Sequence, residues 1–265
     1  MTPVAVSYIL LMMVSGPQNI LGIDIGGSFI KSAPVDTSNG HLLAERYPIA
    51  TPSESAPSVF ADRLKAILAR FSWQGPVGIG FPGVVRQGTV SMAAHLSQEW
   101  LGTNAVATFQ RALSVPVTVL NDADAAGLAE LRFGAGRTDP SISIGTTLVL
   151  TFGTGIGSAL FVNGQLVPNT EFGHTFLAGG QEGEEIAAAA VRTRDNLSWE
   201  DWSSRVSRFL SELEKLVNPD RIILGGGIVE NFSQFERMIK TRAPILPARL
   251  GNNAGLIGAA LAATL

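Results

Sequence analysis

The chain has 265 residues, of which 46% are hydrophobic and 15% charged, with a net charge of −3 and no cysteine. This length is sufficient for one large core or two smaller ones, and the small negative charge argues against a nucleic-acid binder held by bulk electrostatics. The absence of cysteine excludes disulfides, iron–sulfur clusters, cysteine-ligated zinc and thiol catalysis, and it fits a reducing compartment such as the cytoplasm.

The first nineteen residues differ from the pattern that follows them. Residues 4–14 are an apolar run too short to span a bilayer, so we expect no membrane insertion. No Lys or Arg precedes the run, and Ser15-Gly16-Pro17 is a poor cleavage site, which argues against a secretory signal. Met12 or Met13 could be the true start, or the segment could form an extra strand. We treat residues 1–19 as an extension of unclear role.

From residue 20 onward, compact apolar runs alternate with stretches whose apolar residues recur at helical spacing. This alternation predicts an α/β fold. The predicted elements in chain order are strands at residues 20–25, 29–35 and 42–49, a helix at 58–71, strands at 77–79 and 117–120, a helix at 123–133, a strand at 147–152, a helix at 199–217, a strand at 222–224 and a helix at 254–265.

One hairpin pattern occurs twice. Residues 21–28 (LGIDIGGS) and 148–155 (LVLTFGTG) each contain a buried strand, a polar residue two positions before a glycine, and a glycine turn. A second apolar strand follows each turn, at residues 29–35 and 158–162. The repeat indicates two similar lobes that offer glycine turns to a shared cleft. The alternative is that any two β-hairpins look alike, and the form alone does not decide.

The glycine turns could bind phosphate, because glycine lets successive backbone N–H groups approach an anion closely. Ser28 and Thr154 would add hydroxyl donors, and Asp24 could hold Mg²⁺ or its waters. The chain has no Walker P-loop, and Ser158 stands where a Rossmann fingerprint needs its third glycine. Each turn alone could be an ordinary hairpin. Together they favour a nucleotide or polyphosphate, with candidate residues Asp24, Gly26, Gly27, Ser28, Gly153, Thr154, Gly155, Gly225, Gly226 and Gly227.

Two polar clusters could carry the chemistry. Asn121, Asp122 and Asp124 follow a buried strand, and a carboxylate there could orient a sugar hydroxyl and accept its proton during phosphoryl transfer. Helix capping would explain one of these three residues equally well. Glu171 and His174 flank a glycine and could recognise neighbouring hydroxyls of a sugar ring. A lone histidine is more often structural, and both readings stay open.

These motifs together carry a family resemblance. The chain resembles the ROK family of sugar kinases, and within it the branch of polyphosphate- and ATP-dependent glucokinases. The similarity runs in order from about residue 20 to the end. The stretches that carry it are residues 21–36 (LGIDIGGSFIKSAPVD), 76–85 (PVGIGFPGVV), 117–136 (VTVLNDADAAGLAELRFGAG), 148–174 (LVLTFGTGIGSALFVNGQLVPNTEFGH), 218–228 (NPDRIILGGGI) and 252–260 (NNAGLIGAA).

The resemblance implies an actin-like ATPase fold, in which two ribonuclease H-like lobes enclose the active site. The smaller lobe would comprise residues 20–122 and 252–265, and the larger lobe residues 123–251. The resemblance also implies a homodimer in the cytoplasm. Its small-molecule partners would be a sugar and a phosphoryl donor, which is ATP, polyphosphate or both, together with Mg²⁺.

The resemblance assigns roles to individual residues. Asp122 becomes the catalytic base, and Asp24 a candidate ligand of Mg²⁺. The phosphate turns would bind the donor with help from Lys31, and residues 225–227 would lie beside the adenosine. The residues expected to contact the hexose are Pro82, Gly83, His95, Asn121, Glu171, His174 and Glu184.

Three departures from the family pattern bear on the substrate. The cysteine-rich zinc motif of most ROK proteins is absent, as in the polyphosphate-using branch, so no zinc is expected. His95 replaces an asparagine that contacts sugar in that branch, and Phe176 replaces a frequent glutamate. A changed hydroxyl contact can alter which hexose an enzyme accepts.

Several alternatives remain open at this point. The chain could be an ATP-only kinase for mannose, fructose or an N-acetyl sugar, or a sensor that binds sugar without catalysis. ROK repressors carry a helix-turn-helix domain, for which nineteen residues are too few. A polyphosphate donor would favour a groove of basic residues, and the candidates Lys31, Arg86, Arg132 and Arg137 are scattered in the sequence.

Overall fold

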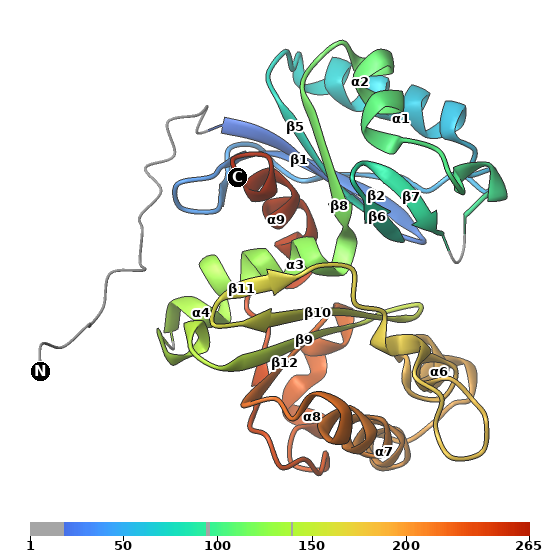
Figure 1. The fold of residues 1–265 in the computed structure, drawn as a ribbon, viewed down its shortest axis with the longest axis vertical. Coiled ribbons are helices and arrows are strands. Elements are labelled where there is room, and N and C mark those ends of the chain that lie inside the picture. Colours follow the sequence, from blue (N-terminus) through green and yellow to red (C-terminus); the bar gives the residue numbers. More distant parts are fainter. Residues whose placement is uncertain (1–18, 94–95, 139) are drawn as a thin grey trace, which may run out of the picture.

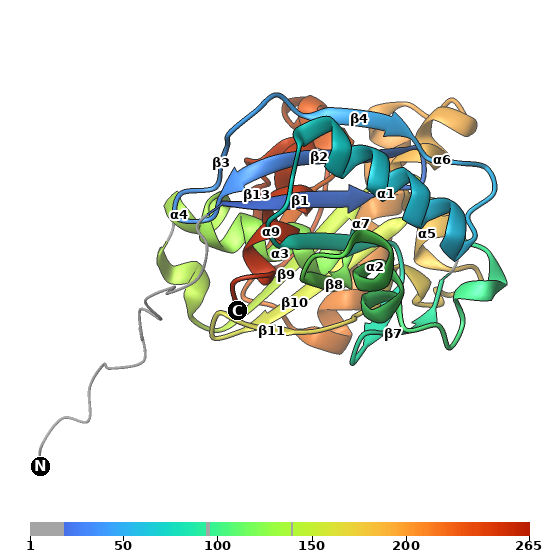
Figure 2. The same cartoon turned by 90° about the horizontal axis from the view of Figure 1, so that it is seen from above.

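Two mixed sheets, with two helices between them, form the body of the molecule (Figures 1 and 2). The structure is a computed structural model that describes residues 19–93, 96–138 and 140–265. The expectations for residues 1–18 and for His95 therefore lie outside the described part of the chain. Among the described residues, none of the helices combines the length and the apolar character needed to cross a membrane.

The first sheet runs in the order β3-β2-β1-β5-β8, and β4 also pairs with β2. β1 is antiparallel to β2 and parallel to β5, which is parallel to β8. Phe60, Phe81, Trp100 and Phe109 fill the core between this sheet and its two outer helices. The bounds are β1 (Asn19–Ile25), β2 (Phe29–Asp36), β3 (His41–Leu42), β4 (Tyr47–Ala50), β5 (Val77–Phe81), β8 (Val117–Asn121), α1 (Pro57–Phe71) and α2 (Ala105–Leu113).

The second sheet runs in the order β11-β10-β9-β12-β13. β9 is antiparallel to β10 and parallel to β12, which is parallel to β13. Its outer core contains Phe152, Trp202, Phe209 and Phe235. The bounds are β9 (Thr146–Phe152), β10 (Ile156–Val162), β11 (Gln165–Val167), β12 (Arg221–Gly225), β13 (Ile245–Pro247), α5 (Gly183–Ala187), α6 (Ala189–Arg194), α7 (Trp199–Val217) and α8 (Phe232–Phe235).

The two sheets have the same topology. In each, an antiparallel edge strand and hairpin are followed by two parallel strands, so the predicted repeat of residues 21–28 and 148–155 is a repeat of the whole sheet. This arrangement confirms the predicted α/β class and fits the actin-like fold that the resemblance implies. The remaining elements are β6 (Val84–Arg86), β7 (Thr89–Met92), α4 (Ala135–Thr138) and the short 3₁₀ helices at Gln98–Trp100, Pro140–Ser143, Phe172–His174, Gly227–Asn231 and Gly251–Asn253.

The predicted third strand, residues 42–49, is wrong as a single element. Leu42 pairs with Val35 and Tyr47 pairs with Ser32, so four residues of one chain segment face two of β2. The extra residues form a bend that separates β3 from β4. Pro34, one of the two residues opposite the bend, has no N–H to donate to a regular ladder.

Two helices occupy the space between the sheets, α3 (Asp122–Arg132) and α9 (Ala254–Ala262) (Figure 1). All residues of α9 from Ala254 to Leu261 are buried, and the helix ends at Ala262 rather than at the predicted residue 265. It packs unusually close to the first sheet. A Cβ on Gly22 or Gly78 would overlap backbone oxygens of α9, so these strand positions accept only glycine.

Candidate active site

A cleft between the two sheets collects the predicted site residues. It encloses about 780 Å³. His95 lies outside the described residues. Every other predicted site residue lines this cleft, namely Asp24, Gly26, Gly27, Ser28, Lys31, Pro82, Gly83, Asn121, Asp122, Gly153, Thr154, Gly155, Glu171, His174, Glu184, Gly225, Gly226 and Gly227.

The two glycine turns face each other across the cleft. In the β1–β2 turn, the N–H of Gly26 donates to the carbonyl of Phe29 at 3.0 Å. In the β9–β10 turn, the N–H of Gly153 donates to the carbonyl of Gly155 at 3.0 Å. A Cβ on Gly27 would lie 3.7 Å from Oγ1 of Thr154, so the gap between the two turns is little wider than one side-chain carbon. An anionic chain bound there would meet backbone N–H groups from both sides.

Asp122 lies at the junction of β8 and α3, where the sheet delivers its side chain into the cleft. The preceding residue, Asn121, caps the helix, because its Oδ1 accepts a 2.9 Å hydrogen bond from the N–H of Asp124. The capping explanation therefore applies to Asn121 and leaves Asp122 in the cleft. Burial, together with the negative charges of Asp24 and Glu171, raises the pKa of Asp122 to about 8.

Asp24 is a second carboxylate in the cleft lining, and its negative charge contributes to the raised pKa of Asp122. A Cβ on Gly80 would lie 3.5 Å from the Cα of Asp122 and 3.7 Å from Oδ1 of Asp24, so Gly80 separates the two acids by a single residue's width. Lys31 donates to Oδ2 of Asp24 at 3.2 Å. Two carboxylates and one ammonium group thus meet at the phosphate side of the cleft.

A set of polar groups beside Asp122 in the cleft forms a hydrogen-bonded network. The Nδ2 of Asn121 donates to the carbonyl of Gly83 at 3.2 Å and lies 3.4 Å from Oε1 of Glu171. Oε2 of Glu184 accepts from the N–H of Ile156 at 3.2 Å. These groups offer both donors and acceptors, which a sugar with several adjacent hydroxyls requires.

His174 is oriented by a carboxylate that sequence reasoning missed. Its Nδ1 lies 2.7 Å from Oε2 of Glu182, and Glu184 is the next acidic group at 3.9 Å. Burial lowers the pKa of His174, but the bond to Glu182 and the charges of Glu184 and Glu171 outweigh it, so the pKa lies above its usual value. Burial also raises the pKa of Glu171, against the effect of the His174 charge.

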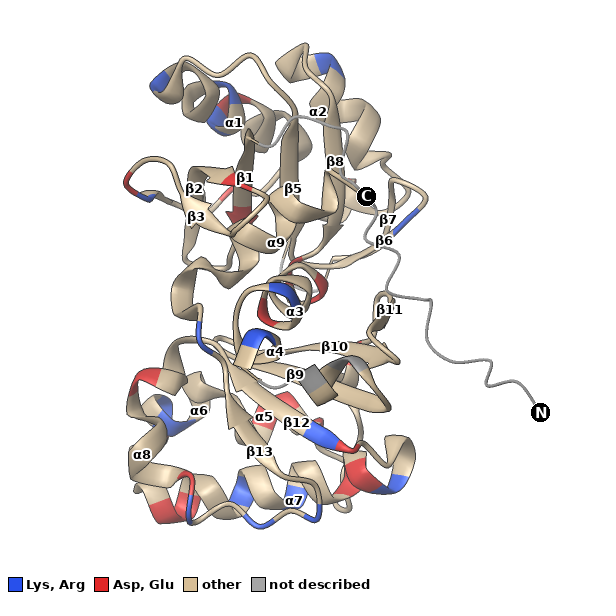
Figure 3. Cartoon of the chain, turned by 90° about the vertical axis from the view of Figure 1, so that its left-hand side faces the viewer, with Lys and Arg blue, Asp and Glu red and all other residues tan. Residues whose placement is uncertain are grey.

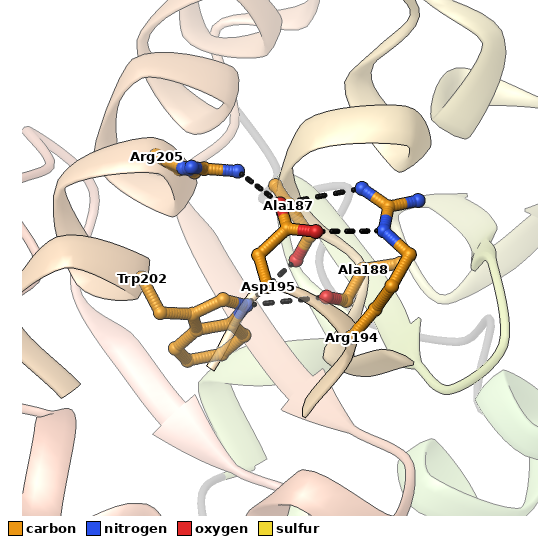
Figure 4. Close-up of polar contacts among 6 residues, drawn as sticks. All are labelled: Ala187, Ala188, Arg194, Asp195, Trp202 and Arg205. Carbon is orange, nitrogen blue, oxygen red and sulfur yellow. Dashed lines mark hydrogen bonds and ion pairs between the residues drawn. The ribbon is translucent and has the colours of Figure 1, made fainter. Parts of the chain in front are cut away.

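The segment that carries Glu182 and Glu184 rests on α7. Glu182 and Glu185 form a capping box at the start of α5, and Nε1 of Trp202 donates to the carbonyls of Ala187 and Ala188 at 3.0 and 3.3 Å (Figure 4). In the same view, Asp195 pairs with Arg194 and Arg205. The N–H of Ala190 donates to the carbonyl of Gly153 at 3.0 Å. One support therefore holds both the sugar-side acids and a phosphate turn.

The cleft is acidic. Within the described residues that line it, Lys31 is the single Lys or Arg side chain and His174 the single histidine, against the carboxylates of Asp24, Asp122, Glu130, Glu171 and Glu184. Arg86, Arg132 and Arg137, the other candidates for a basic groove, are not among the lining residues. Charged residues of both signs gather instead on the outer helices α1 and α7 (Figure 3). The binding of donor phosphates in this cleft would therefore require backbone N–H groups as hydrogen-bond donors and a cation to neutralise the negative charge.

Two further carboxylates support the site: Glu130, which the sequence did not indicate, and Asp124, which belongs to the polar cluster predicted after the strand. The carboxylate of Glu130 accepts N–H bonds from Arg249 at 3.0 Å and from Leu250 at 2.8 Å, and so fixes the loop before α9. Asp124, 1% exposed, accepts from the N–H of Asn169 at 2.7 Å. Arg249 and Leu250 lie more than a hundred residues from Glu130 in the chain, so nothing local in the sequence indicates this contact.

The fold and this cleft are those of a known family. Residues 20–187 match the sequence profile of the ROK family, and the chain belongs to that family. It is 45% identical to the polyphosphate glucokinase of Mycobacterium tuberculosis over 242 residues, which cover 91% of this chain and 89% of that protein.

Solved structures agree with this assignment. The inorganic polyphosphate/ATP-glucomannokinase from Arthrobacter sp. strain KM is 42% identical, with a TM-score of 0.87 over 93% of this chain and 98% of that one. The ROK family glucokinase from Streptomyces griseus, solved with glucose and AMPPNP, has a TM-score of 0.76 at 24% identity, over 91% of this chain and 98% of that one. The latter similarity is evidence for the fold alone. The predicted family and fold are confirmed.

Proposed function

We propose that this chain is a hexose kinase that transfers a phosphoryl group from polyphosphate or ATP to glucose, producing glucose 6-phosphate. The observation that carries the proposal is the position of Asp122. It lies between the phosphate turns on one side and the network of Asn121, Glu171 and Glu184 on the other. The names of the M. tuberculosis and Arthrobacter relatives supply the donor and the sugar.

In this mechanism Asp122 is the general base. Ionised, it would accept the proton of the attacking hydroxyl as that oxygen bonds to phosphorus and the bond to the donor oxygen breaks. The Asn121–Glu171 network and the His174–Glu182 pair would orient the ring, and closure of the lobes would exclude water. A pKa of about 8 makes Asp122 a stronger base than an ordinary carboxylate, and a smaller fraction of it is ionised at neutral pH.

The residues fit a bound Mg²⁺. Asp24 presents a carboxylate, a preferred ligand of this ion, in the cleft lining beside the glycine turns. Mg²⁺ would neutralise charge on the donor phosphates when bound. Lys31 holds Asp24 in place from the side of β2. Because Lys31 is the one Lys or Arg in the described lining of the cleft, we infer that donor binding depends strongly on the metal.

The lobe boundaries belong to the same proposal. Residues 20–122 with 252–265 contain the first sheet and α9, and residues 123–251 contain the second sheet and most of α3. The homodimeric state and the cytoplasmic location, which the family resemblance implies, stay predictions.

The decisive measurement is hexose 6-phosphate formation by the purified protein with Mg²⁺, comparing ATP with long-chain polyphosphate. We expect product from glucose with polyphosphate. Mannose is the second sugar to test, because the name of the Arthrobacter relative includes it. Product with ATP alone would restrict the donor, and no product from any hexose with either donor would refute the proposed kinase.

A further inference from the structure

Asn169 joins three segments that are distant in the sequence. Its side-chain amide pairs with the backbone of Val85, because Nδ2 donates to the carbonyl at 3.1 Å and Oδ1 accepts from the N–H at 2.9 Å. Its own N–H donates to Oδ2 of Asp124 at 2.7 Å. One residue thus holds the β6 strand and the first turn of α3 together.

The geometry is specific to asparagine. Asn169 has a φ of 62°, in the left-handed region that asparagine tolerates better than other side chains. The amide forms with Val85 the two hydrogen bonds that a neighbouring strand residue would form. β6 pairs with β7 in a sheet of their own, with a register shift at Val84 and Val85, so Asn169 occupies the remaining edge of β6 at this irregular point.

Val85 and Asn169 are each two positions from a residue expected to contact the hexose, and Asp124 is two positions from the proposed base, Asp122. Val85 follows Gly83, Asp124 follows Asp122, and Asn169 precedes Glu171. Asn121 then connects the same segments inside the cleft, through Gly83 at 3.2 Å and Glu171 at 3.4 Å. The outer contact and the sugar-side network are therefore parallel connections between the same three pieces of chain.

The burial of Asp124 makes its hydrogen bond from the N–H of Asn169 costly to lose. Asp124 is 1% exposed, and its Oδ1 has no hydrogen-bond partner among the described residues. The Asn169 N–H is thus a principal stabilising group for a buried carboxylate, whose loss would be costly. Neither Asn169 nor Asp124 has a role in the proposed proton transfer, so a different explanation is needed for a buried polar contact at this place.

We propose that Asn169 is a positioning residue that holds the β6–β7 hairpin, the start of α3 and the Glu171 segment in the arrangement that binds the hexose. This inference rests on the proposed function. Without the contact, only the bonds of Asn121 would hold Gly83 and Glu171 together, and the sugar would be held in a wider distribution of poses. A displacement of about 1 Å in a positioned group can cost a large part of the rate. Because the contact adjoins residues expected to contact the hexose, its loss should weaken the binding of the sugar and not that of the donor.

The variant Asn169→Gly tests this inference, because glycine keeps the positive φ and the N–H while removing the two bonds to Val85. Asn163→Gly is the matched control. Asn163 has a φ of 51° and also loses a side-chain hydrogen bond, to the N–H of Gly145 at 2.9 Å, but neither residue of that contact adjoins a residue expected to contact the hexose. For Asn169→Gly we expect KM for glucose to rise about tenfold and KM for the donor to stay within about twofold, from two bonds that each contribute modestly. Asn163→Gly should leave both constants unchanged.

Amide hydrogen exchange provides the second readout, which needs no sugar. The Val85 N–H should exchange faster in Asn169→Gly and at the wild-type rate in Asn163→Gly. An unchanged Val85 amide would overturn the contact itself. Faster exchange with an unchanged KM for glucose would overturn its positioning role. A wild-type protein that phosphorylates no hexose would refute the proposed function, and with it the role of Asn169 in hexose binding.

Discussion

Gly255 in α9 offers a sharp test of the phosphate side of the cleft. A Cβ at this position would lie 2.6 Å from Cγ of Asp24 and 2.7 and 2.9 Å from its two oxygens. Non-bonded atoms normally stay about 3.5 Å apart. In Gly255→Ala the Asp24 carboxylate must therefore move by roughly 1 Å, because the helix backbone is fixed between two sheets.

The expected consequences for rate and stability differ. A displacement of about 1 Å in a positioning group can cost about a hundredfold in rate, so we expect kcat to fall by one to two orders of magnitude. The free energy of unfolding should change little. Overpacking costs about 1–3 kcal/mol, and replacing a helical glycine by alanine returns about 1 kcal/mol.

The assay is kcat at saturating glucose over a range of Mg²⁺ concentrations, together with thermal unfolding of the same samples. Gly258→Ala is the contrasting variant, because its Cβ would overlap the backbone carbonyl of Ala125 in α3 and not a side chain of the cleft. It should lower the melting temperature steeply. If Gly255→Ala retains kcat within about twofold of the wild type, the position of Asp24 does not matter for catalysis and the reasoning is wrong.

Three further predictions concern titrating groups. Asp122→Asn should abolish nearly all turnover while leaving glucose affinity within a few-fold, as measured by calorimetry, because the lost group acts in the transition state. In the wild type, a base with a pKa of about 8 is increasingly ionised as the pH rises, so kcat/KM for glucose should increase up to about pH 8 and then level off; a flat profile below that pH would contradict the assignment. Glu182→Gln should lower the pKa of His174 toward its usual value, because the carboxylate that favours the charged ring is gone, whereas Glu185→Gln, which alters the same capping box, should not. With three histidines in the chain, an NMR titration can follow this pKa, and equal midpoints in both variants would refute the pairing.

The sequence predicted most of the central strands because each is a compact apolar run that ends at glycine or at a polar residue. The repeated pattern at residues 21–28 and 148–155 predicted the internal duplication, since each copy contains the hairpin and the turn of one sheet. The break between β3 and β4 was missed because it depends on the register against β2, which no local pattern records.

The sequence predicted the residues that line the cleft but not the residues that hold them in place. Asp122 and the glycine turns follow strands directly, so local pattern and family resemblance both indicated them. Glu182, Asn169 and Glu130 act through contacts with residues that the fold brings near, such as Val85 for Asn169. Polar residues of this kind resemble ordinary loop or helix residues until the tertiary structure supplies their partners.

The position of α9 has a consequence for how the protein is made. This helix ends near the C-terminus, yet it covers β1 and β5, which the ribosome produces more than 170 residues earlier. The first sheet must therefore wait, with one apolar face uncovered, until nearly the whole chain has emerged. The second half of the protein can form its own sheet in the meantime. Completion of the first lobe, and with it of the Asp24 side of the cleft, becomes a late event in biosynthesis.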